Sequence, residues 1–218
     1  MAIINYNPPT RPYLDIVAQD NDILVLNKPS GLLSVPGKAK EHADCLQSRA
    51  QRVFPTATVV HRLDMATSGL MVMALNKAAH RHISKQFELR ETAKTYQAIV
   101  FDTVQQDKGE VNLPLICDWP NRPKQMIDHE RGKKALTLWR VIERTNNTTR
   151  MELKPITGRS HQLRVHMLSM QHPIIGDRLY AHKQALDMAN RLNLHAMFLS
   201  FRHPATEQTL SFESPVPF

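Results

Sequence analysis

Three patterns follow one another in residues 61–91, HRLDMATSGLMVMALNKAAHRHISKQFELRE. A polar loop comes first, and an apolar run at 69–75 follows it. The remainder carries Ala79, Ile83 and Phe87 at four-residue spacing. A short apolar run bounded by turn residues is typical of a buried strand, and a four-residue apolar repeat is typical of an amphipathic helix. We therefore predict a buried strand followed directly by a helix.

The rest of the chain consists mainly of strand-like runs joined by short polar turns. Asn146 and Asn147 separate two such runs, and the second alternates apolar with charged residues, so one side lies in water. The expected strands cover residues 14–18, 23–27, 95–101, 135–145, 148–156, 194–201 and 209–213. The expected helices cover 76–91, 44–54 with Asp44 as N-cap, and 160–171 with Ser160 as N-cap. Many hairpin-linked strands and few helices predict an α+β fold around a mostly antiparallel sheet.

Length and composition favour one globular domain. The chain has 218 residues, of which 42% are hydrophobic and 22% are charged, and it contains no repeat. This composition excludes wholesale disorder, and the length is typical of a single domain. Residues 1–13 carry three prolines and are expected to form an extended arm, which leaves 14–218 as the domain.

The charge balance favours a polyanionic partner. Lys and Arg number 28 against 20 Asp and Glu, so the formal net charge is +8 and the isoelectric point about 9.7. The simplest polyanion for such a protein is a nucleic acid.

The compartment is expected to be reducing and cytosolic. Cys45 and Cys117 are too few for a disulfide framework and lie in no CxxC pair. The N-terminal residues show no signal-peptide pattern, and the longest apolar stretch, at 70–75, is too short to span a membrane.

The sequence patterns indicate neither a metal nor a nucleotide cofactor. The pairs His80/His82 and His161/His166 lack the spacing of a zinc site. Neither GxxxxGK[ST] nor GxGxxG occurs. We therefore expect no metal and no cofactor.

The polar loop at 61–69 concentrates groups that could carry chemistry. A carboxylate, a guanidinium, an imidazole and two hydroxyls occur there within nine residues. The alternative is a capped loop, in which Asp64 binds the amides of Thr67 and Gly69 while His61 and Arg62 lie in water.

A second polar run, KPITGRSHQLRVH at 154–166, leaves a strand, turns and enters a helix. A helix N-terminus attracts anions, and Arg159 and His161 lie beside it. Arg164 lies among apolar neighbours, so its guanidinium needs a carboxylate or phosphate partner. The alternative is a purely structural salt bridge, for example with Glu152.

Lys77, Arg81 and Lys85 lie at four-residue spacing on the predicted helix, opposite its apolar stripe. Like charges in this arrangement repel one another weakly, and facing phosphates would reverse the sign. The alternative is a basic face that is only solvated.

The loop CDWPNRPKQ at 117–125 combines an aromatic ring, two cations and two prolines. Rings on which bases stack and cations that hold the backbone suit single-stranded RNA. The alternative is a packed surface loop.

These motifs, taken in order, resemble the RluA family of RNA pseudouridine synthases. The resemblance rests on NKPSG at 27–31, HRLD at 61–64 with TSGL at 67–70, KTY at 94–96, GRSHQLRVH at 158–166 and HPIIGD at 172–177. The loop LICDWPNRPKQ at 115–125 resembles the branch of that family that acts on both 23S ribosomal RNA and tRNA anticodon stem-loops. Ala181, after Tyr180, departs from the glycine usual in the family.

The resemblance implies a pseudouridine synthase catalytic fold. This is an α+β domain with a mixed, mostly antiparallel central sheet, flanking helices and a central cleft. No S4-type RNA-binding domain is expected, so the catalytic domain itself would select the target.

The resemblance also implies the chemistry. The uracil leaves its glycosidic bond, turns, and rejoins the ribose through C5, without cofactor or metal. By motif position Asp64 is the catalytic carboxylate, Tyr96 is the ring against the uracil, and Arg164 is the partner of Asp64. The uridine must leave its stack to react, and Arg62 or His61 is expected to fill the gap.

The expected partners are a 23S rRNA stem-loop and the anticodon stem-loop of tRNAs, bound by a monomer. Residues expected to contact RNA are His61, Arg62, Lys28, Lys77, Arg81, Lys85 and Arg159. Two other functions compete with this one. The first is a non-catalytic RNA-binding or ribosome-assembly protein on the same fold, and the second is a metal-dependent nuclease that uses Asp and His.

Overall fold

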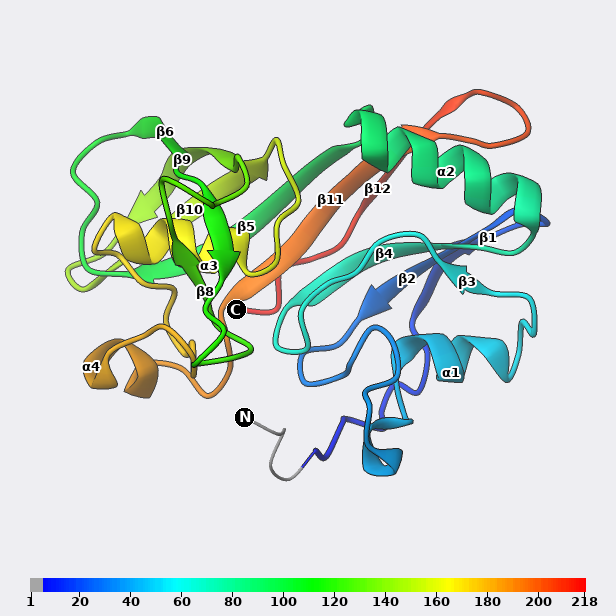
Figure 1. Cartoon of the computed structure of the whole chain (residues 1–218), viewed down its shortest axis with the longest axis horizontal. Coiled ribbons are helices and arrows are strands. Elements are labelled where there is room, and N and C mark those ends of the chain that lie inside the picture. Colours follow the sequence, from blue (N-terminus) through cyan, green and yellow to red (C-terminus); the bar gives the residue numbers. More distant parts are fainter. Residues whose placement is uncertain (1–5) are drawn as a thin grey trace. The chain divides into compact units, whose positions relative to one another are not determined.

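The computed structural model describes residues 6–218 of the chain (Figure 1). The described residues form two compact units. The first unit contains residues 6–94 and 196–217, and the second contains residues 95–195 and 218.

The first unit is built on a sheet in which β1, β2, β4 and β11 lie side by side in that order (Figure 1). β12 pairs with β11 and β3 with β4. Its elements are β1 (Ile16–Gln19), β2 (Ile23–Lys28), a 3-10 turn (Lys40–His42), α1 (Leu46–Gln51), β3 (Thr58–Val59), β4 (Ser68–Ala74), α2 (Lys77–Leu89), most of β11 (Leu194–Arg202) and β12 (Thr209–Glu213). Gly69 lets β4 approach β11 closely, because a Cβ there would lie 2.3 Å from the carbonyl oxygen of Ala196.

The second unit contains a sheet of order β5-β10-β9-β6, in which every neighbouring pair is antiparallel. A separate hairpin pairs β7 with β8. The elements are most of β5 (Ala93–Phe101), β6 (Lys108–Asn112), β7 (Leu115–Cys117), β8 (Gln125–Ile127), β9 (Leu136–Arg144), β10 (Thr148–Pro155), α3 (Gln162–Ser169) and α4 (Lys183–Asp187). Mostly antiparallel strands with few helices confirm the predicted α+β class.

The strand and helix predicted at the centre of the sequence are confirmed as β4 and α2. Every residue of β4 is buried. α2 begins after Asn76, whose side chain accepts the amide of Ala79 at 2.9 Å, and ends at Arg90, which has a left-handed φ of 62°. The buried side of α2 contributes to the core of the first unit, which consists of Ile23, Val25, Leu70, Val72, Ala74, Ala79, Ile83, Leu199 and Phe201, with Phe87 packed against it.

The N-cap predicted for the helix at 44–54 is wrong. The cap of α1 is Cys45, whose thiol accepts the amide of Ser48 at 3.3 Å. The carboxylate of Asp44 instead accepts hydrogen bonds from Nε and Nη2 of Arg49, each at 2.7 Å. The fully buried Arg49 guanidinium needs a carboxylate, and this requirement outweighs the preference of Asp for the cap.

Ser160 is likewise not an N-cap. α3 begins at Gln162, and the residue before it, His161, has a left-handed φ of 53° and makes no capping hydrogen bond. The Gln162 side chain instead holds the turn before the helix, because its Oε1 accepts the backbone amide of Arg159 at 3.0 Å.

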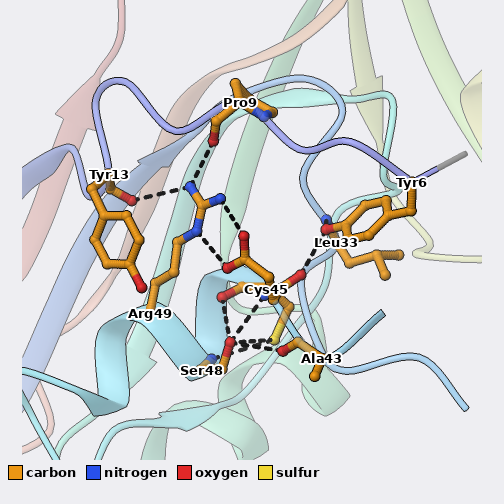
Figure 2. Close-up of polar contacts among 9 residues, drawn as sticks. Tyr6, Pro9, Tyr13, Leu33, Ala43, Cys45, Ser48 and Arg49 are labelled. Carbon is orange, nitrogen blue, oxygen red and sulfur yellow. Dashed lines mark hydrogen bonds and ion pairs between the residues drawn. The ribbon is translucent and has the colours of Figure 1, made fainter. Parts of the chain in front are cut away.

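Residues 6–13, the described part of the predicted arm, contact the region of α1 (Figure 2). The Tyr6 hydroxyl donates to the carbonyl of Asp44 at 2.7 Å. Nη1 of Arg49 donates to the carbonyls of Pro9, at 2.8 Å, and Tyr13, at 3.3 Å (Figure 2). Residues 1–5 lie outside the described part. Within it, every helix is too short or too polar to cross a membrane.

Candidate active site

The loop that carries Asp64 runs from β3 to β4 in the first unit. Asp64 is half-buried, and its backbone carbonyl accepts the amide of Thr67 at 3.1 Å, which closes a tight turn. A second loop, after β2, holds this turn: the hydroxyls of Ser30 and Ser34 each donate, at 2.6 Å, to the carbonyls of Ala66 and Leu63 respectively. The NKPSG and HRLD motifs therefore form one hydrogen-bonded assembly around Asp64.

Lys28 is part of that assembly and does not fit the predicted RNA contact. Its side chain is fully buried, and Nζ donates to the carbonyls of Pro29 at 2.9 Å, Leu32 at 2.7 Å and Met65 at 3.1 Å. An ammonium with three carbonyl acceptors and no exposure cannot also meet an RNA phosphate. Lys28 therefore positions the Asp64 loop.

His61 packs into the first unit and does not lie in water as the capped-loop alternative supposed. Its ring stacks on Phe87, with centroids 4.4 Å apart and an interplanar angle of 18°. Its Nε2 accepts the amide of Val72 at 3.1 Å, so the neutral ring carries its proton on Nδ1. Burial first, and then the nearby Lys94 ammonium, lower the pKa of His61 from 6.5 to about 3.

This lowered pKa predicts that His61 makes stability depend on pH. Between pH 6.5 and about 3 the unfolded chain binds a proton that the folded chain excludes, so the free energy of unfolding falls as pH falls through that window. We expect His61→Gln, whose amide oxygen can still accept from Val72, to lose less stability than the wild type between pH 7 and pH 5. Urea unfolding at both pH values measures this.

The control for this prediction is His129→Gln, because His129 is exposed. That variant is expected to keep the wild-type pH dependence. An equal pH dependence in the wild type and in His61→Gln would contradict the assignment.

Arg62, next to His61, is exposed. It lines an open pocket of about 490 Å³ in the first unit. The pocket is lined by Val35, Gln47, Thr58, Val59, Val60, His61, Arg62 and His80. Of the two candidates for filling the gap behind a flipped uridine, Arg62 has the exposure that the role needs, whereas the His61 ring is held by Phe87 and Val72.

The predicted basic face lies on α2. Lys77, Arg81 and Lys85 are all exposed, whereas Ala79 and Ile83 on the other side of the helix are buried. The structure therefore presents three cations together in the first unit.

In the second unit Arg164 has a carboxylate partner that the sequence analysis did not identify. Its Nε and Nη2 donate to the two oxygens of Asp177, both at 2.7 Å, and the two side chains are 4% and 1% exposed. The alternative prediction, a structural salt bridge between Arg164 and Glu152, is wrong. Glu152 pairs with Arg140 at 2.7 Å and with Lys154 at 3.2 Å. A bidentate, buried pair fixes the plane of the guanidinium.

Tyr180 is a second residue that the sequence analysis did not assign. The Arg164 guanidinium lies 5.0 Å from the centroid of the Tyr180 ring. The Tyr180 hydroxyl accepts the amide of Gln125 at 2.8 Å and lies 2.7 Å from Nδ1 of His161. Asp177 belongs to the HPIIGD motif and Tyr180 follows it closely, so the motif was the signal available for both.

The remaining predicted residues lie on separate elements of the second unit. Tyr96 is half-buried on β5, opposite Leu153 of β10. Arg159 is half-buried in the turn before α3, where its Nε donates to the carbonyl of Lys134 at 3.1 Å.

Asp20, Asp22 and His203 form the group of possible metal ligands found among the described residues, with ligand atoms within 4.8 Å of one another. The hydrogen bonds of the Asp20 carboxylate are those that stabilise a turn of the chain. Asp20 binds His203 at 2.9 Å and accepts the amides of Asp22 and Ile23 at 2.7 and 2.9 Å. Burial raises the pKa of Asp20, but these bonds together outweigh it, so the pKa lies below its ordinary value.

Comparison with known proteins identifies the family. A sequence model described as RNA pseudouridylate synthase matches residues 22–169. The structure superposes on human RNA pseudouridylate synthase domain containing 1 with a TM-score of 0.81 and 30% identity, covering 97% of this chain and 87% of the other. For human RNA pseudouridylate synthase domain containing 4 the TM-score is 0.74 and the identity 27%, covering 93% and 88%. The chain belongs to the RNA pseudouridine synthases, which are isomerases, as the motifs predicted.

Two relatives within that family match this chain over its whole length. It is 56% identical to the dual-specificity RNA pseudouridine synthase RluA of Pasteurella multocida (strain Pm70). It is 55% identical to the protein of the same name from Escherichia coli (strain K12). Both matches span 219 aligned residues and cover 100% of this chain and of the relative.

Proposed function

We propose that this protein converts specific uridines to pseudouridine in two kinds of structured RNA, a 23S rRNA stem-loop and the anticodon stem-loop of tRNAs. The observation that carries the proposal is identity of 54–56% over the whole chain to relatives named for dual specificity. The net charge of +8 supports an RNA partner. Cytoplasm is the expected compartment, because both RNAs are found there.

Asp64, Tyr96 and Arg164 are the proposed catalytic residues, on the strength of their motif positions. The reaction breaks the bond between N1 and C1′, forms one between C5 and C1′, and releases the C5 proton while N1 gains one. Asp64 would attack C1′ or remove the 2′ proton, and both roles require its ionised form. The Tyr96 ring would stack on the uracil, and the Arg164 cation would keep the carboxylate ionised when RNA covers it.

The test is to map pseudouridines in total RNA from cells with and without this gene. We expect sites in both 23S rRNA and tRNA to disappear with the gene and return with a wild-type copy. An unchanged map would refute the proposal and favour a non-catalytic RNA-binding protein. A second test uses purified protein in the presence of EDTA. If the protein still converts uridine and leaves the RNA unbroken, the alternative function of a metal-dependent nuclease is excluded.

The α2 face is proposed to contact RNA phosphates, which predicts an effect on salt dependence. Replacing Lys77, Arg81 and Lys85 together by Ala is expected to weaken RNA binding. The slope of log K against log salt should become shallower by about one unit for each phosphate that the variant no longer neutralises. Filter binding at several salt concentrations measures the slope.

The matched control is Lys108→Ala, because Lys108 is exposed on β6 and belongs to no proposed RNA contact. That variant should keep the wild-type slope. A triple variant with the wild-type slope would show that the α2 face is only solvated.

Arg62 and Arg159 remain proposed RNA contacts, with Arg62 preferred over His61 as the side chain that fills the gap.

A further inference from the structure

The loop between β7 and β8 holds a fixed shape through its own hydrogen bonds. The amide of Asp118 donates to the carbonyl of Lys124 at 3.0 Å, and the amide of Lys124 donates to the carbonyl of Asn121 at 3.1 Å. The Asn121 side chain donates to both carboxylate oxygens of Asp118, at 3.2 and 3.0 Å. A loop closed in this way can present a side chain at a defined position.

Trp119 is the side chain that this loop presents. It is 64% exposed, the largest exposed fraction among the large exposed hydrophobic residues of the described chain. The Arg122 guanidinium lies 4.3 Å from the centroid of its ring. Leaving an indole in water forgoes most of the free energy that its burial would provide, and this exposure does not fit the packed-loop alternative for residues 117–125.

The surroundings of Trp119 favour a nucleobase over a protein as its partner. The other exposed residues of the loop are Pro120, Asn121, Arg122 and Pro123, so polar groups as well as prolines lie beside the ring along the chain. An indole with an adjacent guanidinium is suited to stack on a flat base, while Arg122 and Lys124 supply the charge that a phosphate backbone needs.

The hairpin shares a small core with the helix that carries Arg164. Leu115 of β7 and Val165 of α3 are buried in one cluster with Ala135, and Ile127 and Tyr180 pack against it. The Tyr180 hydroxyl also accepts the amide of Gln125, the first residue of β8. A base held on Trp119 would therefore be fixed relative to Arg164 within the second unit.

We propose that Trp119, with Arg122 beside it, is a stacking site for an unpaired base in the loop of the RNA substrate, distinct from the uridine that reacts. The site adds to affinity and selects stem-loops over fully paired RNA. The inference rests on the proposed function in that it takes a stem-loop RNA as the substrate.

The experiment is a fluorescence titration with a transcript of a tRNA anticodon stem-loop. The chain has two tryptophans, and Trp139 is only 8% exposed, so Trp119 is the one that bound RNA can reach. We expect the stem-loop to quench the wild-type fluorescence, and a fully paired RNA of the same composition to quench it much less. The quench should be lost in Trp119→Phe.

Affinity and turnover provide the second readout. Trp119→Ala is expected to raise Kd and KM for the stem-loop about 5- to 100-fold, with kcat at saturating RNA unchanged. Trp119→Phe, which keeps a ring, should show a smaller rise. The matched control is Val53→Ala, because Val53 is 59% exposed in the first unit and is expected to leave Kd unchanged.

The outcomes separate this inference from the function on which it rests. If the wild type converts uridine but Trp119→Ala has the wild-type Kd and KM, the stacking site is refuted. A quench that survives in Trp119→Phe also refutes it. If RNA quenches Trp119 and Trp119→Ala binds weakly, but the wild type converts no uridine, the stacking site stands and the proposed catalysis fails.

Discussion

Replacing Asp64 by Asn is expected to remove the conversion of uridine to pseudouridine while leaving the fold intact. Asn has nearly the same shape as Asp but carries no negative charge, so it can neither attack C1′ nor accept the 2′ proton. We expect tritium release from RNA labelled at uridine C5 to fall by at least about 10²- to 10⁴-fold.

The structure explains why the fold should tolerate this change. The turn at Asp64 is held by the backbone carbonyl of Asp64 and by hydrogen bonds from Ser30 and Ser34 to neighbouring carbonyls, all of which Asn preserves. Thermal unfolding and RNA binding should therefore remain close to wild type.

The control for Asp64→Asn is Asp187→Asn, because Asp187 is an exposed carboxylate on the surface of α4. That variant should release tritium at the wild-type rate. Undiminished tritium release by Asp64→Asn would falsify the catalytic assignment.

Replacing Arg164 by Ala is expected to cost both stability and activity. The change leaves the Asp177 carboxylate, 1% exposed, without the cation that now binds both of its oxygens. Removing one partner of a buried pair typically costs about 3–5 kcal/mol, because the other charge stays buried. Urea unfolding measures the free energy of unfolding, and tritium release measures the rate.

A double variant separates the structural role of Arg164 from its catalytic role. In Arg164→Met combined with Asp177→Asn the buried charge at position 177 is removed, and an amide oxygen there can still accept the backbone amides of Leu179 and Tyr180, so stability should recover relative to Arg164→Ala. Activity should not recover, because the guanidinium is still absent. Arg164→Lys is expected to be intermediate in stability, since an ammonium cannot bind both carboxylate oxygens in the same plane.

Two results would contradict this account of Arg164. Normal unfolding by Arg164→Ala would show that the pair with Asp177 does not stabilise the folded state. Wild-type turnover by the double variant would show that the guanidinium takes no part in the reaction, and that its role is confined to packing against Asp177 and Tyr180.

The sequence was sufficient for elements whose stability comes from local pattern and burial. The apolar run before Asn76 became the fully buried β4, and the four-residue repeat of Ala79, Ile83 and Phe87 became the inner side of α2. These predictions succeeded because hydrophobic periodicity depends on which face of an element meets the core, and that information lies in consecutive residues.

Helix starts were less predictable, because side chains distant in the sequence compete for the same capping groups. Asp44 is a good N-cap by type, but the buried Arg49 guanidinium binds its carboxylate and Cys45 takes over the cap. At α3 the turn is held by the Gln162 side chain and a left-handed His161, neither of which a capping preference would select.

The family and the proposed catalytic residues could be recognised without coordinates, because HRLD, KTY and GRSHQLRVH are contiguous strings in the chain. What the charged side chains bind could be learned only from the folded chain. Folding buried Lys28 among carbonyls, placed His61 against Phe87, and paired Arg164 with Asp177. The reason is physical: an ion pair or a ring stack depends on distance in space, and no local period in the chain specifies which distant group will come within reach.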